Sequence, residues 1–177
     1  LKKLREDRRF RPGWLGKMDV GKMADEDFKE DTSPANGSSI ILLAEYEDKK
    51  VLFTGDALPG NIIDGLKRLP GYEGRRTYVD AFKVPHHGSK NNNSNELYQA
   101  VDCPRFLVST NGDKFGHPDD EGIARILYNK RKSREVFLHF NYESEINRIW
   151  ADKEMQSENQ YIASYPDEKG SFVDLTA

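Results

Sequence analysis

Short apolar segments alternate with polar turns through the middle of this chain. Five of these segments have the length of a β-strand, at positions 39–46, 50–54, 78–84, 105–109 and 135–140. Three further segments carry apolar residues at helical spacing, at positions 58–69, 94–101 and 119–132. Strands that alternate with helices predict an α/β fold, in which helices flank a mixed sheet.

Local sequence signals indicate where these elements begin and end. The first two strands are separated by the charged residues 47–49, which predicts a β-hairpin. Ser94 is a suitable N-cap for the helix that follows it, and Asp119 or Asp120 caps the helix after Pro118. Three weaker strand candidates lie at 145–151, 160–164 and 172–175.

A change in composition near residue 36 divides the chain into two parts. Residues 1–35 are polar and interrupted by glycine and proline, which predicts a partly irregular N-terminal segment with one short helix. We expect its charged run Lys2–Arg11 to be a solvated, poorly ordered terminus, in preference to a segment that contacts nucleic acid. Residues 36–177 are expected to form one domain. Because the chain begins at Leu1, we expect it to be part of a longer protein.

The composition limits the cellular compartments and the binding partners that are compatible with this chain. The net charge is −3 with both signs interspersed, which argues against a polybasic tail for nucleic acid. The longest apolar run, Ile40–Ala44, is too short to cross a bilayer, and no secretory signal opens the chain. The single cysteine, Cys103, excludes an internal disulfide and indicates the reducing cytoplasm. We expect Cys103 to be a small packing residue.

Two of the predicted strands stop at side chains that can bind metal. The strand at 50–54 runs into Gly55 and Asp56, where the backbone turns sharply. A carboxylate in that position can bridge two cations. The alternative is that Asp56 caps the helix at 58–69.

The strand at 78–84 runs into a histidine pair. Pro85 marks the end of ladder pairing, and adjacent side chains of a strand point to opposite faces. One of His86 and His87 is therefore expected to bind metal, while the other supports it or contacts substrate. Ser89 can bind a phosphate oxygen or cap the next segment.

Two further histidines follow. His117 lies in a polar loop after the strand at 105–109, where α/β sites are usually built. It can bind metal, donate a proton to a leaving oxygen, or only introduce the next helix. His139 lies within a strand, on the face opposite Leu138 and Phe140, and we interpret it as structural.

Four motifs together resemble the metallo-β-lactamase superfamily, and most closely the hydrolase domain of the competence protein ComEC and its soluble relatives. Within residues 36–140 these motifs are Asn36 with Ser38–Leu43, Leu52–Ala57, Phe82–Lys90 and Gly116–Pro118. The resemblance implies an αββα sandwich with a two-metal site at one edge of its paired sheets.

The resemblance also implies roles for individual residues. Asp56 matches the bridging aspartate, and His86 matches a ligand of the second metal, with His87 as the rival candidate. His117 matches a histidine near the site and, like His87, is a candidate catalytic residue. Asn36 matches an asparagine that fixes the loop under the site. The remaining candidates to contact substrate or support the ligands are Ser89 and Lys90.

The main metal motif of the superfamily, His-x-His-x-Asp-His, is absent from this sequence. We therefore expect the chain to be the C-terminal half of the sandwich. The intact enzyme would hold two zinc ions, with manganese as the alternative, and would hydrolyse a phosphodiester, for example in nucleic acid. Asp56 and one histidine are fewer than the three ligands typical of catalytic zinc, so this chain alone is expected to retain metal poorly and to be inactive.

Two other functions stay open. A degenerate copy would be a catalytically dead interaction module, and a thioesterase or lactonase would use the same fold on another substrate. Because half a sandwich exposes one face of its sheet, we expect association with the missing N-terminal half of the same protein or with another copy, and none with a membrane.

Overall fold

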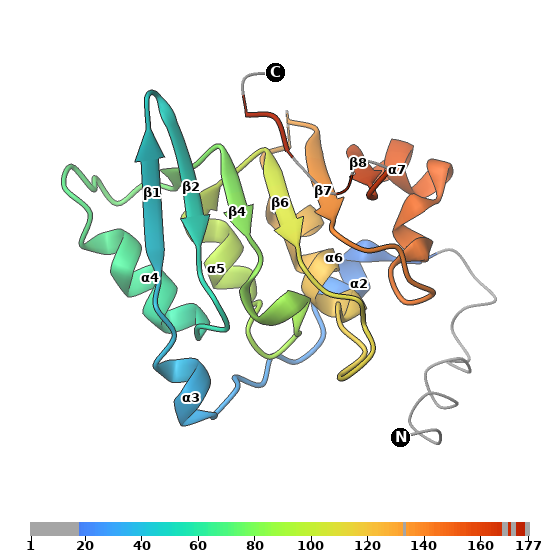
Figure 1. Ribbon diagram of the computed structural model, residues 1–177, viewed down its shortest axis with the longest axis horizontal. Helices are drawn as coiled ribbons and strands as arrows, with labels where there is room; N and C mark the ends of the chain where they lie inside the picture. Colours follow the sequence, from blue (N-terminus) through green and yellow to red (C-terminus); the bar gives the residue numbers. More distant parts are fainter. Residues whose placement is uncertain (1–17, 133, 168–169, 171–172, 176–177) are drawn as a thin grey trace.

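The computed structural model describes residues 18–132, 134–167, 170 and 173–175. Six strands lie side by side in its main sheet (Figure 1), in the order β1 (Leu42–Tyr46), β2 (Lys49–Phe53), β4 (Ala81–Lys83), β6 (Arg105–Val108), β7 (Val136–Phe140) and β8 (Tyr161–Ser164). β1 pairs with β2 in the antiparallel sense, and every later pair is parallel. Two short strands, β3 (Thr77–Tyr78) and β5 (Val101–Asp102), form a separate parallel pair. The predicted α/β class with a mixed sheet is confirmed.

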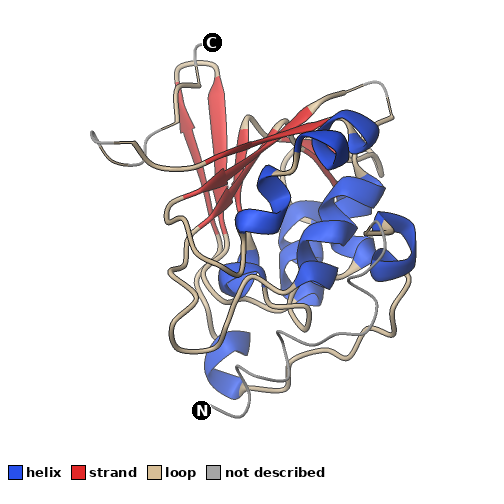
Figure 2. Ribbon diagram, turned by 90° about the vertical axis from the view of Figure 1, so that its right-hand side faces the viewer, coloured by secondary structure: helices blue, strands red, loops and turns tan. Residues whose placement is uncertain are grey.

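The helices gather on one side of this sheet. They are α2 (Val20–Ala24), α3 (Pro34–Gly37), α4 (Pro59–Lys67), α5 (Asn95–Ala100), α6 (Asp120–Asn129) and α7 (Lys153–Asn159), with 3₁₀ turns η1 (Pro85–Gly88) and η2 (Arg148–Ala151). Parallel strands that follow one another in chain order place their right-handed crossovers on the same face. Figure 2 shows this arrangement, with the strands on one side and the main helices on the other. Within the described ranges, no helix has the length and apolar character needed to cross a membrane.

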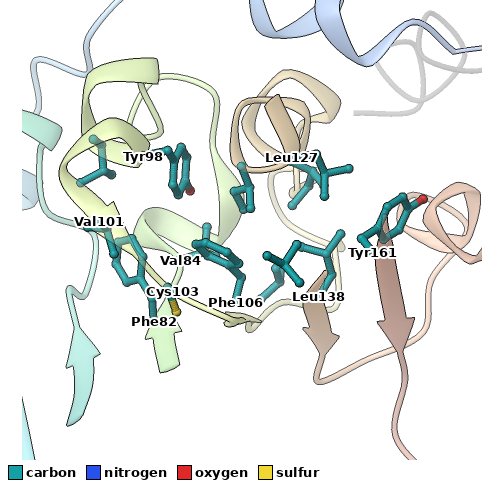
Figure 3. Close-up of a cluster of buried hydrophobic side chains, with 14 of the residues drawn as sticks. Phe82, Val84, Tyr98, Val101, Cys103, Phe106, Leu127, Leu138 and Tyr161 are labelled. Carbon is teal, nitrogen blue, oxygen red and sulfur yellow. The ribbon is translucent and has the colours of Figure 1, made fainter. Parts of the chain in front are cut away.

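The core lies between the sheet and these helices. Leu52, Phe82, Phe106 and Leu138 form one row across four neighbouring strands, and each is at most 3% exposed. Figure 3 shows Tyr98 and Leu127 of α5 and α6 above this row, with Cys103 beside it. Burial raises the pKa of the Cys103 thiol, which keeps the thiol protonated and unreactive. The expected packing role of Cys103 is therefore confirmed.

The opposite face of the sheet is apolar and partly uncovered. Phe53 and Tyr46 lie on it at the β1–β2 edge and are 42% and 78% exposed. Farther along the sheet, Leu107, Tyr165 and Leu175 are among the residues that line a hollow of about 550 Å³. We call this side of the sheet, from β1 to β8, the open face.

Part of the polar N-terminal segment belongs to the folded domain. α2 packs against α6 and buries Val20 and Ala24. Arg125 of α6 donates hydrogen bonds to Ala24 O (3.4 Å) and Glu26 O (2.9 Å), which ties this segment down. The described part of this segment, from residue 18, holds α2 and the start of α3, where the sequence predicts one short helix. The charged run Lys2–Arg11 lies outside the described residues.

The structure differs from the strand predictions in three segments. Segment 145–151 contains the 3₁₀ turn η2, in which Trp150 is fully buried. Segment 78–84 is not one strand, because Val79 N–H donates to Asp102 O while Asp80 N–H donates to Lys50 O. The pairing partner thus changes between two adjacent residues. Of the candidate 172–175, residues 173–175 carry no strand and residue 172 lies outside the described part.

Other boundaries agree closely with the predictions. The hairpin is β1–β2, and the segments at 58–69, 94–101 and 119–132 contain α4, α5 and α6. Ser94 caps α5, since its side chain accepts a hydrogen bond from Leu97 N–H (3.3 Å). Asp119 occupies the N-cap position of α6 without a capping bond from its side chain. Its carboxylate instead accepts from Lys90 N–H (3.0 Å), which ties α6 to the loop after η1.

Candidate functional site

The ends of β2 and β4 are fastened together where the candidate site begins. Thr54 Oγ1 donates a hydrogen bond to Lys83 O (2.8 Å), and His86 N–H donates to Gly55 O (3.1 Å). β2 and β4 are parallel, so their carboxyl ends lie at the same edge of the sheet. Asp56 therefore emerges beside the turn that carries the histidine pair.

Asp56 faces one of these histidines. Its Oδ1 lies 3.9 Å from His87 Nε2, and both side chains are about two-fifths exposed. Asp56 does not cap α4, because the N-cap position there belongs to Leu58. Lys83 brings a positive charge to the same place, since its Nζ donates to Gly55 O (3.3 Å). Burial lowers the pKa of Lys83, and the nearby charge of Asp56 only partly opposes this shift.

His86 and His87 lie in the 3₁₀ turn η1 and not in a strand. Both have left-handed backbone conformations, with φ of 42° and 56°. Such conformations cost about 1–3 kcal/mol each in residues other than glycine, and they concentrate at functional sites. The expectation that adjacent imidazoles point to opposite faces is therefore wrong here. The bend instead makes the two rings neighbours, with 6.1 Å between their centroids.

His117 reaches the same edge from the loop after β6. Its ring meets that of His86 edge-on, with 5.4 Å between centroids. Its Nδ1 is buried 3.3 Å from Asp119 Oδ2, close enough for an ion pair but without the alignment of a hydrogen bond. His139 stays away from this group, because its Nδ1 bonds Ser164 Oγ (2.7 Å) on the open face. Three of the four histidines thus gather with Asp56.

The three residues expected to contact substrate or support the ligands make contacts within the protein. Asn36 Nδ2 donates to Asp31 Oδ2 (2.5 Å) and lies 3.3 Å from His86 Nδ1. Ser89 is buried, and its N–H donates to His86 O (2.9 Å). Lys90 Nζ pairs with the buried Glu121 Oε1 (2.8 Å). In this arrangement, Ser89 and Lys90 stabilise the loop behind the histidines.

Two polar residues at the site escape prediction from the sequence. Asp31 Oδ2 lies 3.6 Å from His86 Nδ1, and Asn92 Oδ1 lies 2.9 Å from the same nitrogen. Asp31 belongs to an acidic stretch of the N-terminal segment, and Asn92 to a run of three asparagines that reads as a plain polar loop. No local signal distinguishes them, because the contacts that define them join distant parts of the chain.

The side chains of the site, as they are arranged here, do not form a complete metal-binding group. Among the described residues, no set of three or more His, Cys, Asp or Glu side chains is arranged to hold a metal ion. No family model matches the sequence, and comparison with curated proteins and with solved structures finds no significant match. The observed class is thus an α/β protein with a histidine-rich group at the carboxyl ends of its strands. Any assignment of function depends on that group.

Proposed function

We propose that this chain is part of a metal-dependent hydrolase that cleaves phosphodiesters, and that it forms the C-terminal half of a metallo-β-lactamase sandwich of the ComEC-like branch. One observation carries the proposal: Asp56, His86, His87 and His117 lie together at the edge where the parallel strands end. That edge is where α/β proteins bind their ligands. Two left-handed histidines in succession add weight, because such strain is kept where function requires it.

The donor atoms suit zinc, with manganese as the second candidate. Imidazole nitrogen and carboxylate oxygen both bind zinc. Asp56 Oδ1 and His87 Nε2 are 3.9 Å apart, against roughly 3.4 Å for two ligands of a tetrahedral zinc ion. A small side-chain rotation would bring both atoms to one cation. A pair of cations would supply hydroxide at neutral pH and would stabilise the charge that develops on an ester oxygen.

The side chains around Asp56 and His87 have separate roles in the proposed reaction. His117 lies at the same edge, 3.3 Å from Asp119 Oδ2, and we assign to it the donation of a proton to the leaving oxygen. Lys83 places a positive charge next to Asp56, where it attracts the negative charge of a phosphodiester. Because the chain brings too few ligands for tight binding, we infer that it retains zinc weakly by itself.

Activity of the complete protein tests the proposed function. We expect hydrolysis of bis-p-nitrophenyl phosphate, with a loss of at least about 100-fold in Asp56→Asn, because that change removes a charged metal ligand. Asp64→Asn is the matched control, since Asp64 is an exposed residue of α4 whose Oδ1 lies 3.7 Å from Lys67 Nζ, and it should leave the rate unchanged. Equal rates in the two variants would contradict the assignment.

The same assay separates the alternatives. Hydrolysis of a thioester or lactone in place of the phosphodiester would favour a related hydrolase of the same superfamily. A catalytically dead interaction module is favoured by the lack of a three-ligand group among the described residues. An upstream coding sequence without the His-x-His-x-Asp-His motif, together with no turnover, would support that module.

We also propose that the N-terminal half of the sandwich covers the open face. Sheets of parallel strands are normally buried on both sides, whereas here Leu107 and His139 of the parallel strands β6 and β7 line a hollow on that face. At the antiparallel edge of the same face, Leu42, Phe53 and Tyr46 are exposed apolar side chains. We place the protein in the cytoplasm, where the single cysteine, Cys103, stays reduced. A second copy of the chain is the competing occupant of the face.

Dye binding and light scattering test the open face. We expect the isolated chain to bind an apolar-surface dye and to self-associate, and Phe53→Lys to reduce both, because it places a charge in the apolar surface. Tyr128→Lys is the matched control, since Tyr128 is an exposed aromatic residue of α6. A monomer that binds no dye would contradict the proposal.

A further inference from the structure

The orientation of the Asn92 side chain is fixed by its partners. Asn92 is fully buried, and its Nδ2 donates hydrogen bonds to Asp31 Oδ2 (3.2 Å) and to Asp56 O (3.2 Å). A carboxylate and a backbone carbonyl can only accept hydrogen bonds. The NH₂ group of Asn92 must therefore face Asp31 and Asp56. Its oxygen faces His86 in consequence.

This orientation decides which nitrogen of His86 carries the proton. Asn92 Oδ1 lies 2.9 Å from His86 Nδ1 and offers only lone pairs, so this contact requires Nδ1 to donate. Asn36 Nδ2 faces the same nitrogen from a longer distance, 3.3 Å, and donates its closer hydrogen bond to Asp31 Oδ2 (2.5 Å). A neutral imidazole has one ring proton, so placing it on Nδ1 leaves Nε2 with a free lone pair. An unprotonated ring nitrogen is what a metal ligand or a general base requires.

Asp31 reinforces this arrangement. Its Oδ2 lies 3.6 Å from His86 Nδ1, where a negative charge favours a proton on that nitrogen. Burial would raise the pKa of Asp31, but hydrogen bonds from Asn36, Ser33 N–H and Asn92, together with the charge of His86, lower it overall. Asp31 is therefore ionised at neutral pH. It is also well anchored, since its N–H donates to Asn91 O (3.0 Å).

We propose that Asp31 and Asn92 are positioning residues that hold His86 in the tautomer protonated on Nδ1, with Nε2 free to bind a metal ion or to accept a proton. The tautomer follows from the contacts of this chain alone, whereas its use by a metal depends on the proposed function. The proposal gives the N-terminal segment a role at the site, because Asp31 brings its charge to a histidine on η1.

The tautomer is directly measurable by NMR on the ¹⁵N-labelled, metal-free chain. Two-bond correlations between ring protons and ring nitrogens distinguish the two neutral forms, and the spectrum of His86→Gln identifies the signals of His86. We expect the pattern of the Nδ1–H form at neutral pH. Asn92→Ala should lose this pattern in favour of the Nε2–H form or a mixture, because the acceptor for Nδ1–H is gone.

Two further variants make the test specific. Asp31→Asn removes the charge and turns one of the two accepting oxygens into a donor, so it should shift the tautomer ratio in the same direction as Asn92→Ala. Asn91→Ala is the matched control, because Asn91 is the exposed neighbour and its backbone, not its side chain, bonds Asp31 N–H and Ser89 Oγ. It should leave the tautomer unchanged. An Nε2–H pattern in the wild-type chain would overturn the proposal, as would an unchanged pattern in a folded Asn92→Ala.

If Asn92→Ala does not fold, the wild-type and Asp31→Asn spectra still decide the question. Addition of Zn²⁺ to the wild-type chain tests the proposed function separately. We expect the ring signals of His86 and His87 to shift only at zinc concentrations above the micromolar range. If the ring signals of both histidines do not shift at any zinc concentration, the proposed metal site is contradicted, but the tautomer assignment is not affected.

Discussion

Replacing Gly122 by alanine is expected to destabilise the protein by about 3 kcal/mol. A Cβ at this position would lie 2.5 Å from Gly88 O and 3.3 Å from Gly88 C. Both are backbone atoms, so no side-chain rotation can relieve the clash. Gly88 cannot easily retreat, because its carbonyl accepts a hydrogen bond from Asp119 N–H (3.0 Å). α6 would have to move away from the turn that carries His86 and His87.

Gly65→Ala is the matched control for this substitution. Gly65 is also a helical glycine, in α4, but a Cβ there meets nothing within 4 Å. Alanine should stabilise α4 by about 1 kcal/mol through its higher helix propensity. Urea unfolding of the two variants measures the difference. Similar midpoints for Gly122→Ala and Gly65→Ala would show that the contact between α6 and η1 is looser than described.

Replacing Arg125 by methionine is expected to cost about 3–5 kcal/mol. Arg125 is 1% exposed, and its guanidinium donates hydrogen bonds to the backbone carbonyls of Ala24, Glu26, Lys90 and Asn93, at 2.8–3.4 Å. Methionine fills much of the same volume but removes the hydrogen bonds that Arg125 donates to Glu26 O, Lys90 O and Asn93 O, while Ala24 O keeps a hydrogen bond from Asn95 Nδ2 (2.9 Å). Arg125→Lys should rescue little, since an ammonium group lacks the planar fork that reaches separate acceptors.

The control for this second substitution is Arg131→Met. Arg131 Nε lies 2.8 Å from Asp102 Oδ2, but its side chain is 54% exposed and Asp102 keeps Arg134 as a partner at 3.2 Å. We expect a cost below about 1 kcal/mol. Hydrogen exchange adds a local measurement: Arg125→Met should speed exchange at Met23 and Asp31, because their segment loses its tie to α6. Equal unfolding costs for the two methionine variants would refute this interpretation.

Elements with a strong apolar period follow directly from the sequence. β6 and β7, and the helices α4 and α6, have buried positions at the spacing of a strand or a helix. The β1–β2 hairpin follows instead from two apolar runs on either side of a charged turn, since Leu52 is the one buried residue of its two strands. α7 gives a weak signal, because Met155 and Gln156 are its only buried residues. In segment 145–151, Ile146 and Trp150 are four residues apart, which fits a helical turn better than an alternating strand.

The site was predictable where its residues directly follow a strand or lie in the loop after one, as His117 does after β6. Asp56 and His86 come after β2 and β4, whose parallel pairing sets them side by side, so a strand pattern suffices to bring them together. The bend at His86 and His87 was not predictable, because non-glycine residues rarely adopt left-handed conformations. Asp31 and Asn92 were equally hidden, since they lie 61 positions apart and meet only after the chain has folded.

The strand order has a consequence for how the molecule is made. Along the main sheet, the strands stand in the order in which a ribosome would release them, from β1 to β8. No later strand has to insert between two earlier ones. Each new strand with its helix can therefore dock on a surface that is already complete, so the nascent chain can assemble one layer at a time during synthesis.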